Sequence, residues 1–312
     1  MTITESTTPM TPHKAGRLAR AAAYSSVAVA LFLIVIKLFA LVATGSVAML
    51  GSLIDSALDA LASVLNAFAI HQASQPADRE HRFGHGKAEA IAGLGQAVFI
   101  SGSALFLAFQ SITRLAKPEP LGESMVGVVV ILISMAATVA LVMFQRFVVR
   151  RTKSLAVTAD SLHYRGDLFM NAAVIAALLL GGLPGMARVD AVFGLAIAGY
   201  IGYGAWAIVR LSFDQLMDHE LDDDARARIK EIVKRHPEVR SMHDLRTRLS
   251  GFDTFIQLHL ELDPKMPLAR AHDVSDQVEA ALKEAFPGAQ VLIHEDPAGH
   301  EDVPAEPYRV AH

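Results

Sequence analysis

The chain has 312 residues, of which 52% are hydrophobic and only 19% are charged, and its mean hydropathy is +0.36. This composition is too apolar for an ordinary soluble protein and excludes intrinsic disorder. Because the chain has no cysteine, disulfides, thiolate nucleophiles and cysteine metal ligands are excluded as well.

The charge is distributed unevenly along the chain. Residues 1–211 contain 16 basic and 11 acidic residues, whereas residues 212–312 contain 12 basic and 21 acidic residues. We therefore expect a membrane domain followed by an acidic soluble domain. An acidic soluble part disfavours nucleic acid as a partner.

Six stretches are long and apolar enough to cross a bilayer core, which needs roughly 20 residues of helix. They are residues 20–43, 46–70, 88–114, 124–147, 156–181 and 188–211. The domain organisation that we expect is an N-terminal arm (1–19), a six-helix transmembrane domain (20–211), a cytoplasmic domain (212–297) and a flexible tail (298–312).

The basic residues of the short loops predict the orientation in the membrane. Eleven Lys and Arg residues lie in the N-terminal arm, the second and fourth loops and after the sixth span, against three on the other side. Both termini and the acidic domain are therefore expected on the cytoplasmic side of the membrane.

The acidic domain is predicted to have the element order αββαβ. Residues 222–236 and 268–286 have helical patterns, whereas 239–249, 254–262 and 290–294 resemble strands. In the second strand Phe255, Gln257, His259 and Glu261 alternate with apolar residues and share one face. This order favours a small two-layer α+β domain.

Two of the spans contain pairs of ionisable residues. Asp55 and Asp59 in the second span are four residues apart, as are His163 and Asp167 in the fifth, so each pair shares one helix face. A carboxylate in hydrocarbon is costly unless it is paired or hydrated, which makes such residues functional candidates. Together they offer a four-ligand shell of nitrogen and oxygen that suits Zn²⁺, with other divalent metals as alternatives.

The alternative for these residues is a pair of helix-packing hydrogen bonds. Asp160 either supports the ligands without binding the metal itself or is a carboxylate at a helix end, and the two interpretations are equally supported. Arg165, two positions after His163, points to the other side of the helix, and the pattern assigns it no role. Lys37 in the first span is expected to extend its ammonium toward the membrane interface.

The second loop contains Asp78, His81 and His85, whose spacing would let them close around one metal ion. A solvated basic loop with incidental histidines is the alternative. The acidic domain contains a further set of potential ligands, namely His243, His259, His272, His294 and Asp296. Their spacing alone favours surface histidines, because it matches no recognised metal motif.

Three motifs of the membrane part occur together with the tail sequence His243-Asp244-Leu245-Arg246-Thr247-Arg248. They are Asp55-x-x-x-Asp59, Phe83-Gly84-His85-Gly86-Lys87-Ala88-Glu89 and His163-x-x-x-Asp167. With these motifs the sequence resembles the cation diffusion facilitator family, in particular its YiiP-like bacterial zinc exporters, over about residues 15–297.

The resemblance implies a homodimer whose protomers each have six transmembrane helices and a cytoplasmic ferredoxin-like, metallochaperone-like domain. It implies a transport site at Asp55, Asp59, His163 and Asp167, a loop site at Asp78, His81 and His85, and a binuclear cytoplasmic site at His243, His259, His272, His294 and Asp296. It also implies a charge pair between Lys87 and Asp218. Arg165 departs from the family, in which an uncharged residue is expected.

The sequence is therefore interpreted as a proton-coupled antiporter that exports Zn²⁺, or alternatively Cd²⁺, Fe²⁺ or Mn²⁺, from the cytoplasm. Zinc would be its substrate and also a regulatory or structural ion, and its partners would be metal ions, protons, lipid and a second copy. No bond is made or broken, so no enzyme is expected. The rival interpretations are a membrane metal sensor and a monovalent cation/proton antiporter, although Na⁺ prefers sites with oxygen ligands only.

Overall fold

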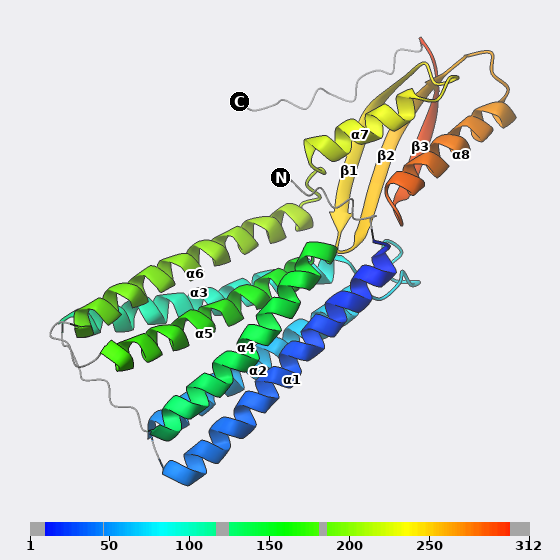
Figure 1. The fold of residues 1–312 in the computed structure, drawn as a ribbon. Coiled ribbons are helices and arrows are strands. Elements are labelled where there is room, and N and C mark those ends of the chain that lie inside the picture. The colour runs from blue at the N-terminus through cyan, green and yellow to red at the C-terminus, as the bar shows by residue number, and fades with distance from the viewer. Residues whose placement is uncertain (1–9, 46, 117–124, 181–185, 300–312) are drawn as a thin grey trace, which may run out of the picture. The chain divides into compact units, whose positions relative to one another are not determined.

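In the computed structural model, six long helices form the part of the chain before Asp218 (Figure 1). Their bounds are α1 (Pro12–Thr44), α2 (Val47–Ala73), α3 (Lys87–Ala116), α4 (Met125–Thr152), α5 (Leu155–Leu180) and α6 (Met186–Leu216). The residues described are 10–45, 47–116, 125–180 and 186–299. The tail beyond residue 299, predicted as flexible, and the break at Lys117–Pro120 lie outside them.

Among the described residues, five helices have the length and hydropathy of a membrane span, and α5 is the exception. With 26 residues α5 is long enough, but His163, Arg165 and Asp167 lower its hydropathy. The predicted helical membrane domain is confirmed. α1 begins before the expected residue 20 and α6 continues past residue 211, because the flanking polar residues are compatible with helix once it leaves the apolar core.

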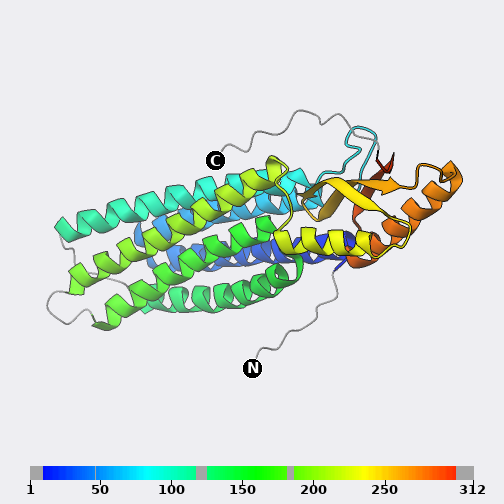
Figure 2. The ribbon, with the colours of Figure 1, turned by 90° about the horizontal axis from the view of Figure 1, so that it is seen from above.

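Figure 1 shows the six helices as two groups, α1 with α2 and α4, and α3 with α5 and α6. The groups contact each other through α4 with α5 and α2 with α3, and in Figure 1 they diverge toward the far end of α5. Within the second group α3 and α6 run side by side in both views (Figures 1 and 2). Small residues such as Ala19, Ala22 and Ala23 of α1 are buried, as expected where membrane helices approach closely.

From Asp218 on, the chain forms a second compact unit, apart from residues 250–252. Its elements are α7 (Asp223–Lys234), β1 (Ser241–Ser250), β2 (Asp253–Leu262), α8 (Leu268–Ala285) and β3 (Gln290–Pro297). The predicted αββαβ order is confirmed. Asp222 caps α7 by accepting a hydrogen bond from the backbone N–H of Ala225, which satisfies one of the free donors of the first turn.

The strands form one sheet in the order β1-β2-β3. A two-residue link joins β1 to β2, and Gly251 in this link has a φ of 60° that glycine adopts without strain. β2 and β3 are parallel, with His259 opposite His294 and Glu261 opposite Asp296. The third strand is longer than expected and contains Asp296, which the sequence had placed after the strand.

The alternation of β2 separates the two faces of the sheet. Ile256, Leu258 and Leu260 are buried against Val274 and Val278 of α8 and belong to the core of this unit. His259 and Glu261 occupy the other face and are only half-buried. The helices therefore cover one face of the sheet and leave the polar face open.

We expect Leu258→Ala to lower the free energy of unfolding of the cytoplasmic unit by about 2–5 kcal/mol, because it creates a cavity in the core. Leu292→Ala on the neighbouring strand is the matched control and should change it by less than about 0.5 kcal/mol, since Leu292 is 63% exposed and Leu258 only 1%. Urea unfolding followed by circular dichroism measures both. Equal losses for the two variants would contradict the assignment of the faces.

Candidate metal centres

Asp59 on α2 and His163 and Asp167 on α5 meet inside the helix bundle. The Nε2 atom of His163 lies 3.0 Å from Oδ1 of Asp59 and 3.7 Å from Oδ2 of Asp167. One potential ligand atom of each residue lies within 4.8 Å of the others. Because a neutral imidazole and two carboxylates are ligands that divalent metals accept, the three side chains could hold one ion.

Asp55 lies one helical turn before Asp59 and is not part of this group of three. We call the group of Asp59, His163 and Asp167 the membrane centre, and Asp55 remains a predicted fourth ligand of it. The four-residue spacing on α2 places its side chain on the same helix face as that of Asp59.

Lys37 on α1 does not extend to the membrane interface as predicted. Its ammonium donates hydrogen bonds to the carbonyl of Ser52 at 3.2 Å and to the hydroxyl of Ser56 at 2.6 Å. It also lies close enough to Asp55 and Asp59 for electrostatic attraction. The polar groups of α2 give the ammonium partners inside the bundle, so it needs no water. The sequence signal for this role is that Lys37 is the only lysine of the apolar stretch 20–43.

Arg165 and Asp160 lie on α5 beside these ligands. One guanidinium nitrogen of Arg165 donates to the hydroxyl of Ser161 at 3.1 Å. Asp160 lies in the second turn of α5 and is 1% exposed. It accepts hydrogen bonds from the side chains of Ser26 and Gln145, so it is a buried hydrogen-bonded residue and not a carboxylate at the helix end.

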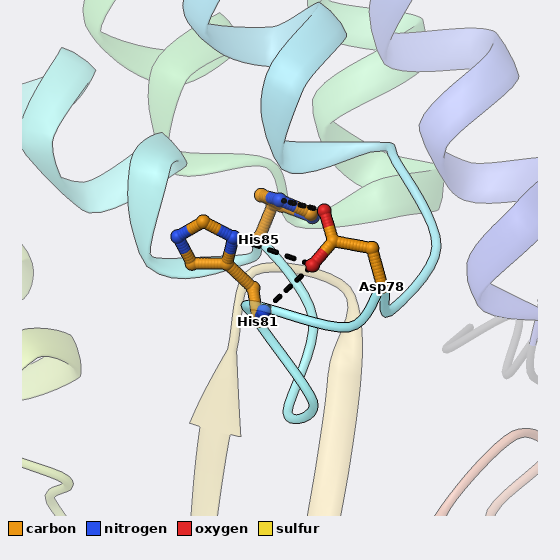
Figure 3. Close-up of side chains that lie close together, drawn as sticks. All are labelled: Asp78, His81 and His85. Atoms are coloured by element: carbon orange, nitrogen blue, oxygen red, sulfur yellow. Dashed lines mark hydrogen bonds and ion pairs between the residues drawn. The ribbon is translucent and has the colours of Figure 1, made fainter.

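Asp78, His81 and His85 converge in the loop between α2 and α3 (Figure 3). The carboxylate of Asp78 lies 3.4 Å from Nδ1 of His81 and 3.3 Å from Nε2 of His85. Backbone N–H groups of His81 and Glu80 donate to the same carboxylate. These hydrogen bonds, above all the one from His81, hold the pKa of Asp78 below its usual range. The carboxylate therefore stays ionised at neutral pH, as a metal ligand must.

The open face of the sheet gathers one residue from each strand, namely His243, His259 and Asp296. Asp296 accepts from Nδ1 of His259 at 2.8 Å and lies 3.5 Å from Nε2 of His243. The ring of His294 lies 4.7 Å from that of His259, and its Nε2 atom lies 3.3 Å from Asp296. Four of the five predicted cytoplasmic ligands are thus brought together.

His272 is separated from the other four. It lies on α8, is exposed, and its Nε2 atom lies 3.6 Å from a carboxylate oxygen of Asp276 on the same helix. Because α8 covers the apolar face of the sheet and the cluster occupies the opposite face, the sheet lies between them within one protomer. Its role as a ligand remains a prediction.

The predicted charge pair involves one residue from each of the two units. Lys87 donates to the carbonyl of Leu216 at 3.2 Å, and Asp218 accepts from Arg248 at 3.1 Å. The pairing of Lys87 with Asp218 remains a prediction.

Comparisons with known proteins agree with both units of the chain. The family model "Cation efflux transmembrane domain" matches residues 23–217, and "Cation efflux protein, cytoplasmic domain" matches residues 221–298. A relative described as cation-efflux pump FieF from Pectobacterium carotovorum subsp. carotovorum is 49% identical over 92% of this chain and 95% of its own length. Relatives of the same description from Yersinia enterocolitica and Klebsiella pneumoniae are each 50% identical, over 90% and 91% of this chain and 93% and 94% of their own lengths.

We expect simultaneous replacement of His243, His259 and His294 by alanine to remove metal from the cytoplasmic face and to leave the fold intact, because these side chains lie on the open face. Calorimetric titration with Zn²⁺ should show a lower binding stoichiometry. His236→Ala is the control, since this half-buried histidine lies 3.1 Å from the side-chain oxygen of Gln277 and outside the cluster. An unchanged stoichiometry in the triple variant would rule out the cytoplasmic site.

Proposed function

The chain belongs to the cation efflux family, and we propose that it exports Zn²⁺ from the cytoplasm in exchange for protons. Members of this family are transporters, so the chain is a metal-cation efflux protein and not an enzyme. The observation that carries the proposal is the group of Asp59, His163 and Asp167 inside a helical membrane domain.

The location of this group supports transport rather than storage. Two carboxylates inside an apolar bundle are costly to maintain, and such residues in membrane proteins characteristically mark ion pathways. His163 is buried, whereas the side chains of Asp59 and Asp167 are 27% and 38% exposed. A metal ion at His163 would therefore have a route to one side of the bundle.

The ligand chemistry favours Zn²⁺ as the substrate. One imidazole with carboxylates forms a mixed nitrogen and oxygen shell that suits tetrahedral Zn²⁺. Cd²⁺, Fe²⁺ and Mn²⁺ accept related shells, so a flux panel with these four metals decides the preference. Na⁺ and K⁺ are added to this panel, because a monovalent cation antiporter would move them and a sensor would bind metal without moving any ion.

Proton coupling follows from competition for the same lone pairs. Zn²⁺ requires neutral imidazole and ionised carboxylate, so binding a proton weakens binding of the metal. One proton that moves down a potential of 100 mV supplies about 2.3 kcal/mol, which biases metal release several tens of fold. Metal would bind from the cytoplasm, the helix groups would rock, and protonation from outside would release it.

The cytoplasmic unit is proposed to sense metal and to join two protomers. In the proposed orientation, the protein spans a bacterial plasma (inner) membrane with both termini in the cytoplasm, which the excess of Lys and Arg in the loops on that side supports. In a homodimer, His272 of a second copy could approach the open face of the sheet, which it does not reach within its own protomer. Metal bound there would stabilise the dimer, because it binds the assembled form preferentially.

We expect Asp55→Ala to abolish Zn²⁺ flux into proteoliposomes while the dimer still purifies intact, because the membrane centre loses a proposed ligand. Asp59→Ala and Asp167→Ala should behave in the same way. Asp214→Asn on α6, outside the candidate centre, is the control and should keep its flux. Normal flux for Asp55→Ala would remove Asp55 from the transport site.

We expect His163→Asp to retain some metal binding but to shift the pH dependence of flux downward. An imidazole ordinarily titrates near pH ~6.5 and a carboxylate near pH ~4, so replacing the imidazole by a carboxylate moves the competition between proton and metal to lower pH. Zn²⁺ flux from pH 5.5 to 8 measures the profile of both proteins. If the two profiles coincide, His163 is not the coupling proton site and a carboxylate takes its place.

A further inference from the structure

A buried polar cluster surrounds Asp160, three residues before His163 on α5. The carboxylate accepts hydrogen bonds from the Ser26 hydroxyl at 2.5 Å and from the Gln145 amide at 2.8 Å. The Gln96 amide donates to its other oxygen at 3.4 Å. All four residues are buried, so the carboxylate depends on these donors in place of water.

The cluster continues through Tyr164. Its hydroxyl donates to the backbone carbonyl of Ser26 at 3.2 Å and lies 2.9 Å from the hydroxyl of Ser63. We call these residues the Asp160 cluster: Ser26, Ser63, Gln96, Gln145, Asp160 and Tyr164. They come from α1, α2, α3, α4 and α5.

The hydrogen bonds of the Asp160 cluster cross between the two helix groups. Ser26, Ser63 and Gln145 belong to the group of α1, α2 and α4, whereas Asp160 and Tyr164 belong to the group of α3, α5 and α6. The cluster lies near the beginning of α5, at the end where the groups meet, and Figure 1 shows them apart at the far end of α5.

The exposed fraction of the acidic residues and His163 on α5 increases from the beginning of the helix toward its far end. Asp160 is 1% exposed, the His163 side chain 9% and the Asp167 side chain 38%. Before Asp160, Val157 is buried among Ala19, Ala22 and Val148 of α1 and α4. The membrane centre is thus covered on the side of the Asp160 cluster and more accessible on the side of Asp167.

We propose that the Asp160 cluster is a clasp that closes the membrane centre toward the beginning of α5 and must separate before metal can enter from that side. The inference rests on the proposed transport function, because only a transporter has to open its site alternately to two sides. It assigns a conformational role to a buried carboxylate that, among the described residues, has no hydrogen bond to a candidate ligand.

A polar clasp suits this task better than an apolar contact. Hydrogen bonds are directional, so a partly opened cluster leaves buried polar groups unsatisfied, which is costly. A fully opened cluster admits water, which satisfies the same groups again. The cluster therefore favours two states, closed and open, over the intermediates between them.

The experiment measures the opening directly by labelling one cysteine. Because the chain has no cysteine, Val157→Cys introduces a single thiol at a position that is 2% exposed. The variant dimer is purified into nanodiscs and treated with a water-soluble maleimide, and the rate of labelling reports how often the groups separate. Thermal unfolding of each protein is measured in parallel.

In this background Asp160→Asn should raise the labelling rate about tenfold, as loss of one charge-assisted hydrogen bond changes an equilibrium by roughly that factor. Ser134→Ala on α4 is the control and should leave the rate unchanged. Ser134 is buried like the residues of the cluster, but its hydroxyl has no hydrogen-bond partner among the described residues.

Exchanging the two partners provides the decisive variant. In Asp160→Asn with Gln145→Glu, the amide is on α5 and the carboxylate on α4, so the hydrogen bond between the groups is restored with its donor and acceptor exchanged. The labelling rate should return to within about twofold of the parent. A destabilised protein would not recover in this way, because the exchange restores only the bond across the groups.

An unchanged rate for Asp160→Asn, or a double variant labelled as fast as Asp160→Asn, overturns the clasp. If Asp160→Asn lowers thermal stability too far to be measured, Ser26→Ala takes its place and should raise the rate by a smaller factor. Flux into proteoliposomes is assayed separately. A parent protein that moves no metal would refute the proposed transport, whereas the labelling rates would still decide whether the cluster holds the groups together.

Discussion

An ionisable side chain inside an apolar helix bundle needs a partner, because hydrocarbon supplies neither water nor a counter-ion. The membrane unit meets this requirement with a few polar groups, each shared among helices. His163 lies between the carboxylates of Asp59 and Asp167, and Lys37 binds the polar groups of α2. The packing of α2 against α5 therefore depends on the same residues that could bind a cation.

The same requirement explains why ligands and packing residues are close together on α5. Asp160 takes its donors from α1, α3 and α4, whereas His163, one turn later, faces Asp59 of α2. α5 is therefore held by hydrogen bonds at Asp160 and presents its candidate ligands one turn later. If it moved as a rigid helix, both sets of contacts would change together. Changes in its contacts with the first helix group would then alter access to the metal centre.

The cytoplasmic unit contains a similar set of histidine and carboxylate ligands, but on a solvent-facing sheet instead of inside a helix bundle. Water is available on the open face of the sheet, so an ionised carboxylate there is not costly. What a metal site requires here is that the ligands lie close together. The strand register places His259 opposite His294 and brings Asp296 beside both rings. The alternation that buries Leu258 and Leu260 is what exposes His259 between them. Core packing and the candidate site are thus two consequences of one pattern.

The sequence by itself determined the helical spans, the αββαβ order and the candidate ligands, because hydrophobic periodicity and i, i+4 spacing are local properties. It predicted that Asp55 shares a helix face with Asp59 and that His163 shares one with Asp167. It could not determine that Lys37 turns inward, that His272 is separated from the cytoplasmic cluster by the sheet, or that Asp160 connects two helix groups. Those facts depend on which helices and strands become neighbours, and contacts between residues far apart in the chain are decided only when the whole bundle and sheet pack together.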